Sequence, residues 1–115
     1  MKMTRGDTKK FKFKRQTKDG QVITDLPSKM YITFKKHDYL KEFVFQKRLD
    51  EGITYNNETN YYHVVINPED TCDLHCGCKE LYYDIEILVN DEVKTINKGV
   101  LEIETDITCS HSKEV

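Results

Sequence analysis

Residues 81–89, which read LYYDIEILV, and residues 98–108, which read KGVLEIETDIT, decide the fold class of this chain. In the first stretch every second side chain is apolar, which is the alternation of a β-strand with one face in a core. Asn90 and Asp91 follow, and both residue types tolerate the positive φ angles of a two-residue hairpin turn. We therefore expect a hairpin into residues 92–97 and a further strand after Lys98 and Gly99.

Similar short patterns fill the rest of the chain. Residues 8–15 predict a first strand, and Asp19-Gly20 predicts the turn after it. Residues 30–34 and 61–66 alternate as further strands do, and Asn67 before Pro68 predicts a short helical turn. About eight short strands with one helical turn, and no long amphipathic helix, predict an all-β sandwich.

Length and composition are consistent with one small domain. The chain has 115 residues, of which 37% are hydrophobic and 33% charged, as expected for thin strands that each show one face to water. We expect a single domain over residues 1–109 and a flexible tail over residues 110–115. No apolar run approaches the roughly 20 residues of a membrane span, and residues 1–8 lack an apolar secretion core. We expect no membrane insertion, and synthesis in a reducing cytoplasm.

The small net charge of −2 hides a division along the chain. Residues 1–48 carry 14 Lys and Arg against 5 Asp and Glu, whereas residues 49–115 carry 4 against 15. One interpretation is that basic and acidic strands pair across the sheets. The other is a molecule with a positive and a negative face, suited to packing against copies of itself or a charged partner. Residues 9–15, KKFKFKR, fit an amphipathic strand better than a nucleic-acid site.

Several short phrases together resemble a known family. They are RGDT at residues 5–8, MYITFK at 30–35, INPEDT at 66–71, CG at 76–77, YYDIEI at 82–87, KGVLEI at 98–103 and DIT at 106–108. In this order they are similar to small immunoglobulin-like structural proteins of phages and prophages, and to the N-terminal domains of phage baseplate upper proteins. The resemblance covers nearly the whole chain and implies an immunoglobulin-like β-sandwich. It contains no catalytic fingerprint.

The resemblance implies a non-enzymatic structural or assembly protein of a virion, placed on the tail, baseplate, fibre attachment or capsid. Its expected partners are other virion proteins, in a homo-oligomer or a symmetric multicopy assembly, and nucleic acid is not expected. Exposed aromatic side chains and the acidic strand face are the candidate interface residues. The aromatic candidates are Tyr39, Tyr55 and Tyr61, and the acidic ones are Asp84, Glu86, Glu102 and Glu104.

The cysteines are the one cluster with the chemistry of a metal site. Cys72, Cys76, Cys78 and Cys109, with His75 or His111, supply enough soft and borderline ligands for a structural Zn²⁺. Their spacing lacks the paired Cys-x-x-Cys knuckles of common zinc sites. Disulfides from Cys72 or Cys78 to Cys109, and free semi-buried thiols, are the alternatives. We expect free thiols and no cofactor.

No set of residues has the spacing of a catalytic site. Cys76 beside His75 is not a nucleophile and base pair, because adjacent side chains point apart. Asp84 and Glu86 are expected on a solvent face opposite lysines, not as a catalytic carboxylate pair. Two other functions stay open, namely a small zinc-stabilised binding module and a domain that adheres to the host surface.

Overall fold

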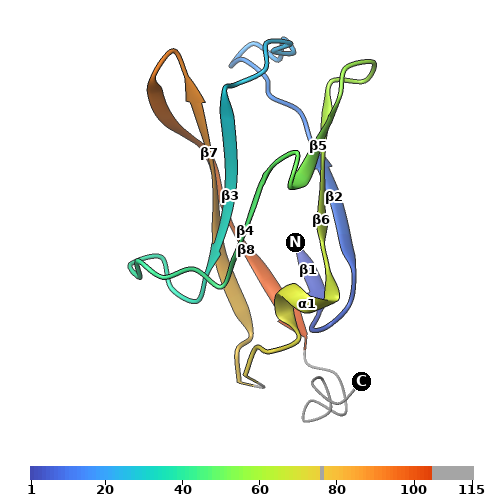
Figure 1. Ribbon diagram of the computed structural model, residues 1–115, viewed down its shortest axis with the longest axis vertical. Helices are drawn as coiled ribbons and strands as arrows, with labels where there is room; N and C mark the ends of the chain where they lie inside the picture. Colours follow the sequence, from blue (N-terminus) through green and yellow to red (C-terminus); the bar gives the residue numbers. More distant parts are fainter. Residues whose placement is uncertain (76, 105–115) are drawn as a thin grey trace.

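The computed structural model describes residues 1–75 and 77–104 of the chain (Figure 1). Within these residues it contains eight strands and one short helix. The strands are β1 (Lys2–Thr4), β2 (Lys9–Phe13), β3 (Lys29–Lys35), β4 (Phe45–Leu49), β5 (Gly52–Asn56), β6 (Tyr61–Ile66), β7 (Glu80–Val89) and β8 (Glu92–Glu104), and the helix is α1 (Pro68–Thr71). The expected content of about eight strands with one helical turn is confirmed, although β7 and β8 are longer than predicted.

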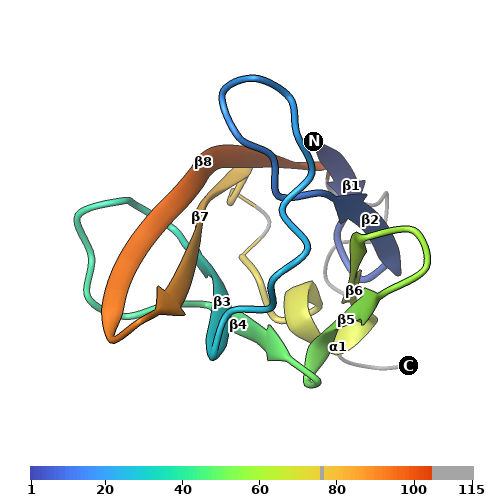
Figure 2. The same ribbon diagram turned by 90° about the horizontal axis from the view of Figure 1, so that it is seen from above.

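The strands form one hydrogen-bonded sheet that is rolled into two layers. Its order is β1-β8-β7-β3-β4-β5-β6-β2. Figures 1 and 2 show β3, β7 and β8 in one layer and β2, β5 and β6 in the other. Strand β4 joins the layers, since it runs antiparallel to β3 and then pairs in parallel with β5 through Arg48 with Gly52 and Leu49 with Ile53. This arrangement confirms the predicted sandwich.

The core lies between the two layers and comes from the alternating strands. The inward positions of β3, β6 and β7 are the apolar ones that the sequence pattern predicts. Ring stacking reinforces the packing, because the centroids of Phe34 and Phe45 lie 4.3 Å apart and those of Phe13 and Tyr62 lie 5.2 Å apart. The side chains buried in these three strands are Met30, Ile32, Phe34, Tyr62, Val64, Ile66, Leu81, Ile85 and Ile87.

The hairpin between β7 and β8 forms at the predicted turn. Asn90 and Asp91 have φ angles of 51° and 63°, which is the left-handed geometry of a two-residue hairpin loop. The separate strand expected after Lys98 is wrong, because β8 is continuous from Glu92 to Glu104. A bulge lies within it, since Glu86 pairs with Thr95 while the preceding Ile85 pairs with Asn97. The extra residue is Ile96.

Strand β1 was not predicted from the sequence. Its three residues pair in parallel with the end of β8, with Lys2 opposite Glu102 and Thr4 opposite Glu104. The first strand was expected at residues 8–15, where β2 in fact runs from Lys9 to Phe13. Three residues are too few to show an alternating pattern, and their pairing partner lies about 100 residues further along the chain.

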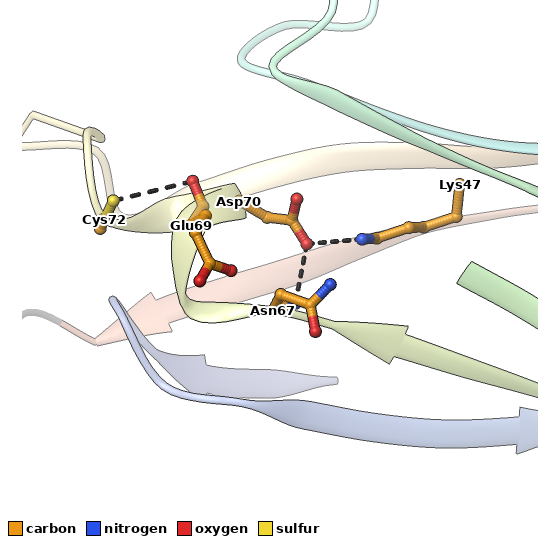
Figure 3. Close-up of polar contacts among 5 residues, drawn as sticks. All are labelled: Lys47, Asn67, Glu69, Asp70 and Cys72. Carbon is orange, nitrogen blue, oxygen red and sulfur yellow. Dashed lines mark hydrogen bonds and ion pairs between the residues drawn. The ribbon is translucent and has the colours of Figure 1, made fainter. Parts of the chain in front are cut away.

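A buried ion pair fixes the helix against strand β4 (Figure 3). The Lys47 ammonium lies 2.6 Å from Asp70 Oδ2, and the two side chains are 8% and 18% exposed. The same carboxylate oxygen accepts a hydrogen bond of 2.7 Å from the backbone N–H of Asn67, at the start of α1. One carboxylate therefore both caps the helix and neutralises an inward lysine.

Candidate interaction surface

The three tyrosines predicted as interface anchors lie in three separate places. Tyr39 is 77% exposed in the loop after β3, where its ring stacks on His37 with centroids 5.2 Å apart. Tyr55 was expected to be exposed, and this is wrong. Its ring packs 4.7 Å from the buried Tyr62, and its hydroxyl donates a hydrogen bond of 2.7 Å to Asn60 Oδ1. Tyr55 is therefore a packing residue at the rim of the core.

Tyr61 lies under two lysines on the outer face of β2 and β6. The ammonium groups of Lys12 and Lys14 are 4.3 and 4.5 Å from the centroid of its ring. These distances are within the range of a cation–π interaction. Tyr61 is half-buried, so most of what this face presents to solvent is the positive charge above the ring. Residues 9–13 therefore form an amphipathic strand, as expected, with Phe11 and Phe13 packed against the core.

The acidic residues near the end of β8 are paired with the N-terminal strand. Lys2 Nζ lies 3.2 Å from a carboxylate oxygen of Glu104 and 3.9 Å from one of Glu102. All three side chains are more than half exposed, so water screens both ion pairs and each contributes little to stability. Glu102 and Glu104 are thus accessible, but they lie beside a cation.

Asp84 and Glu86 lie in the middle of their layer, between strands. Asp84 is opposite Thr33 on β3 and Lys98 on β8, and Glu86 is opposite Tyr31 and Thr95. The lysines of β3 lie opposite uncharged residues of β7, Lys29 opposite Leu88 and Lys35 opposite Tyr82, so the register does not pair basic with acidic residues between these two strands. Acidic and basic side chains are interleaved here and do not form a separate negative face.

A shallow hollow of about 310 Å³ lies over this part of the layer, lined among others by Lys35, Tyr82 and Asp84. The Tyr82 hydroxyl donates a hydrogen bond of 2.9 Å to Glu80 Oε1, and this bond raises the pKa of Tyr82 above its usual value. Asp84 Oδ1 is buried and makes no hydrogen bond within the described residues.

The cysteines are described only in part. Cys72 and Cys78 are half-buried and form no disulfide with a described residue, and their sulfur atoms lie 3.7 Å from the carbonyl oxygen of Glu69 and 3.6 Å from that of Glu80. No group of three or more His, Cys, Asp or Glu side chains within residues 1–75 and 77–104 is arranged to hold a metal ion.

The remaining members of the proposed zinc set, Cys76, Cys109 and His111, lie outside the described residues. His75 is described, and its Nδ1 accepts a hydrogen bond of 2.9 Å from the N–H of Gly77. The zinc site and the disulfides to Cys109 therefore stay predictions.

Strand β8 presents a long free edge that sequence reasoning missed. It pairs with β7 along its length, but on its other side β1 covers only residues 102–104, as far as residues 1–75 and 77–104 show. Residues 92–98 are all exposed, and three apolar side chains of β8 project into solvent. These are Val93, Ile96 and Val100, which are 68%, 40% and 37% exposed. An exposed strand edge with apolar side chains is a template for pairing with another chain.

A second hollow, of about 490 Å³, lies beside this edge. It lies between β7 and β8 of one layer and the end of β2 in the other. We call it the seam. Its walls are the start of β8, the inner face of β7, the end of β2 and the segment after β2. The apolar side chains that line it are Phe13, Ile23, Ile85, Ile87 and Ile96.

The alternating pattern of residues 81–89 was the available signal for this surface. It fixes the inward side chains of β7, but an edge is free or covered according to which strand pairs beyond it, and that pairing is long-range.

None of the described helices is long and apolar enough to span a bilayer.

Comparison with known proteins supports the fold. No protein family and no curated protein matches the sequence. One solved structure of similar architecture is that of the NK cell receptor NKp44, which its description calls a triggering partner in natural cytotoxicity. The likeness covers 92% of this chain and 95% of that chain, with a TM-score of 0.52 and 8% sequence identity. At this identity the likeness concerns the fold alone, and it confirms the predicted immunoglobulin-like β-sandwich.

Proposed function

We propose that this chain is a non-enzymatic structural module of a phage or prophage particle, which acts through protein–protein interfaces. The resemblance of the sequence phrases to phage structural proteins supports the assignment of the chain to a particle. The sandwich architecture supports a role as an interaction module, because immunoglobulin-like sandwiches present edges and loops around a rigid core. The partners are other proteins of the particle, and the chain is present there in multiple symmetric copies.

The proposal of an interface rests on the free edge of β8. An unpaired edge with Val93, Ile96 and Val100 exposed invites strand pairing and is a hazard for a protein that works alone. Strand addition also gives an assembly protein both affinity, from main-chain hydrogen bonds, and a fixed geometry. The edge is therefore suited to a permanent neighbour.

The experiment that tests this function is a count of the chain in purified particles. Particles are banded on a density gradient, and the chain is quantified by mass spectrometry against a labelled standard of the same sequence. We expect the chain to band with the particles at a fixed multicopy stoichiometry, while an abundant host cytoplasmic enzyme stays at the top of the gradient. A chain that stays with the host enzyme, and sediments alone as a monomer at every salt concentration, contradicts the proposal.

A further inference from the structure

We propose that the β8 edge and the seam together bind an extended acidic segment of a neighbouring protein, which adds to the sheet as a strand. The inference rests on the proposed function for the presence of such a neighbour. It goes further in naming the place, the backbone conformation and the charge of the segment. Three independent features carry it: the backbone of the edge, the apolar seam and the sign of the charges.

The backbone of β8 requires an extended partner. The N–H of Glu102 donates a hydrogen bond of 2.9 Å across the edge to the carbonyl oxygen of Met1. Because backbone groups alternate sides along a strand, the N–H of Val100 points to the same edge, where no strand covers it within the described residues. The N–H of Lys98 is satisfied by the side chain of Asn97, at 2.9 Å. An added strand extends the ladder that β1 begins.

Apolar side chains on one face of the added strand can pack in the seam. Successive side chains of a strand point to opposite faces, so every second side chain of the added segment faces the seam. Ile96, the bulge residue, lies at the border between edge and seam and is 40% exposed. An apolar side chain beside it contacts Ile96 and Ile23 and covers the opening between the layers. The segment therefore alternates apolar residues with others.

The charges around the site select an acidic partner. The charged side chains that line the seam are Lys14, Arg15 and Lys94, and the described lining contains no carboxylate. The Lys14 ammonium lies over the Tyr61 ring, so Arg15 and Lys94 are the seam charges that count here. The β8 edge adds Lys98, and its one acidic residue before Glu102 is Glu92 at the hairpin end. A carboxylate-bearing strand is attracted to this edge, and a lysine-bearing strand is repelled.

The same charges argue against a second copy of this chain as the occupant. Strand β2 is the other long strand at the end of the sheet, and its sequence KKFKF has three lysines and no acid. Pairing of the stretch from Lys94 to Lys98 with the same stretch of a copy, or with β2 of a copy, brings lysines close to lysines, which destabilises cross-strand pairing. The occupant is thus a segment of a different protein.

The test is a titration of the ¹⁵N-labelled full-length chain with synthetic nonapeptides at low salt, followed by NMR. The probe alternates Glu and Val. One control peptide replaces every Glu by Lys, and another replaces the central Val of the acidic peptide by Pro. We expect the acidic peptide to shift the amide signals of Val93, Val100 and Ile23, and the lysine peptide to bind about tenfold more weakly. The proline peptide loses a backbone donor and an extended strand, so its binding falls as well.

A charge reversal on the protein provides the matched test. Lys94→Glu lowers the affinity for the acidic peptide about fivefold, which corresponds to about 1 kcal/mol for one partly exposed charge. Lys41→Glu makes the same change in the loop after β3 and leaves the affinity unchanged. Equal binding of the acidic and lysine peptides, no binding at all, or shifts confined to the Lys12 and Tyr61 face overturns the inference.

The outcome separates this inference from the proposed function. If the acidic peptide binds the β8 edge but the chain is absent from particles, the edge site stands and the particle role fails. If the chain is a multicopy particle component but the peptide does not bind, the particle role stands and the edge site is overturned.

Discussion

Asp70 is a residue whose single side chain serves two partners. Its carboxylate neutralises Lys47 at 2.6 Å and accepts the N–H of Asn67 at 2.7 Å (Figure 3). Lys47 is buried on the same face of β4 as Phe45 and Leu49, and its Cδ lies 2.6 Å from where a Cβ on Gly52 would be. A lysine in this position is tolerable only with a carboxylate beside it, because an unpaired buried charge is costly.

Replacing Asp70 therefore destabilises the domain far more than replacing its exposed neighbour. Asp70→Ala leaves the Lys47 ammonium buried without a counter-charge and removes a helix cap, and we expect a loss of about 3 kcal/mol in the free energy of unfolding. Glu69→Ala removes an exposed carboxylate from the same helix and costs about 0.5 kcal/mol. Urea unfolding measures both. A loss for Asp70→Ala no larger than that for Glu69→Ala contradicts the role of the ion pair.

Tyr62 gives the core a sensitivity to alkaline pH. Burial raises the pKa of Tyr62 above its usual value of 10.0, and the nearby positive charge of Arg15 only partly offsets this. The folded state therefore keeps the hydroxyl protonated where the unfolded chain releases the proton. Its contribution to stability is complete below pH 10 and declines as the pH rises from 10 to the raised pKa.

Tyr62→Phe is expected to remove this decline. The hydroxyl is buried and makes no hydrogen bond within the described residues, so its loss at neutral pH changes stability by less than about 1 kcal/mol. Above pH 10, urea unfolding of Tyr62→Phe loses less stability per pH unit than the parent chain does. Tyr39→Phe, at an exposed tyrosine, keeps the parent profile. An identical alkaline profile for parent and Tyr62→Phe refutes the assignment.

The β7–β8 hairpin shows at the scale of elements what the sequence determines. The alternation of residues 81–89 and the Asn90-Asp91 turn correctly predicted the strand, its inward face and the loop. The bulge at Ile96 was not predictable, because Lys94, Ile96 and Asn97 all turn toward the seam and break the alternation. Strand β1 was missed because only its distant partner, residues 102–104, makes it a strand.

The candidate site was predictable to a smaller degree. Tyr55 has the sequence context of a surface tyrosine, yet Asn60 and Tyr62 hold it in place, and both contacts require the folded β5–β6 hairpin. The acidic face was placed on the correct side of β7, but the lysines that interleave it come from β1 and β8. Local pattern identifies which side chains face outward, and only long-range pairing decides what lies beside them.

The turn of the hairpin offers a prediction at this scale. Both loop residues have positive φ, where glycine has no steric penalty and a β-branched residue has a large one. Asp91→Gly is expected to stabilise the domain by about 0.5 kcal/mol and Asp91→Val to destabilise it by about 1 kcal/mol or more. Thermal unfolding ranks the three proteins. Any order other than Gly above Asp above Val is inconsistent with the left-handed turn.

At the scale of the whole molecule, the described part of the sandwich leaves the β8 edge uncovered over residues 92–101. Part of the charge division between the halves of the chain is absorbed where Lys2 of β1 meets Glu102 and Glu104 of β8. The β8 edge and the seam remain basic and partly apolar. The proposed assembly role follows from this remaining surface and from the family resemblance.

Hydrogen exchange of the β8 backbone amides tests the central claim most directly. Amides that point to β7 are bonded in the sandwich, whereas that of Val100 points to the free edge. We predict that the Val100 amide of the isolated chain exchanges fast, and that saturating acidic peptide slows its exchange at least about tenfold, as a new strand hydrogen bond requires. A Val100 amide that is already protected in the isolated chain, or that exchanges equally fast with peptide bound, would contradict the account.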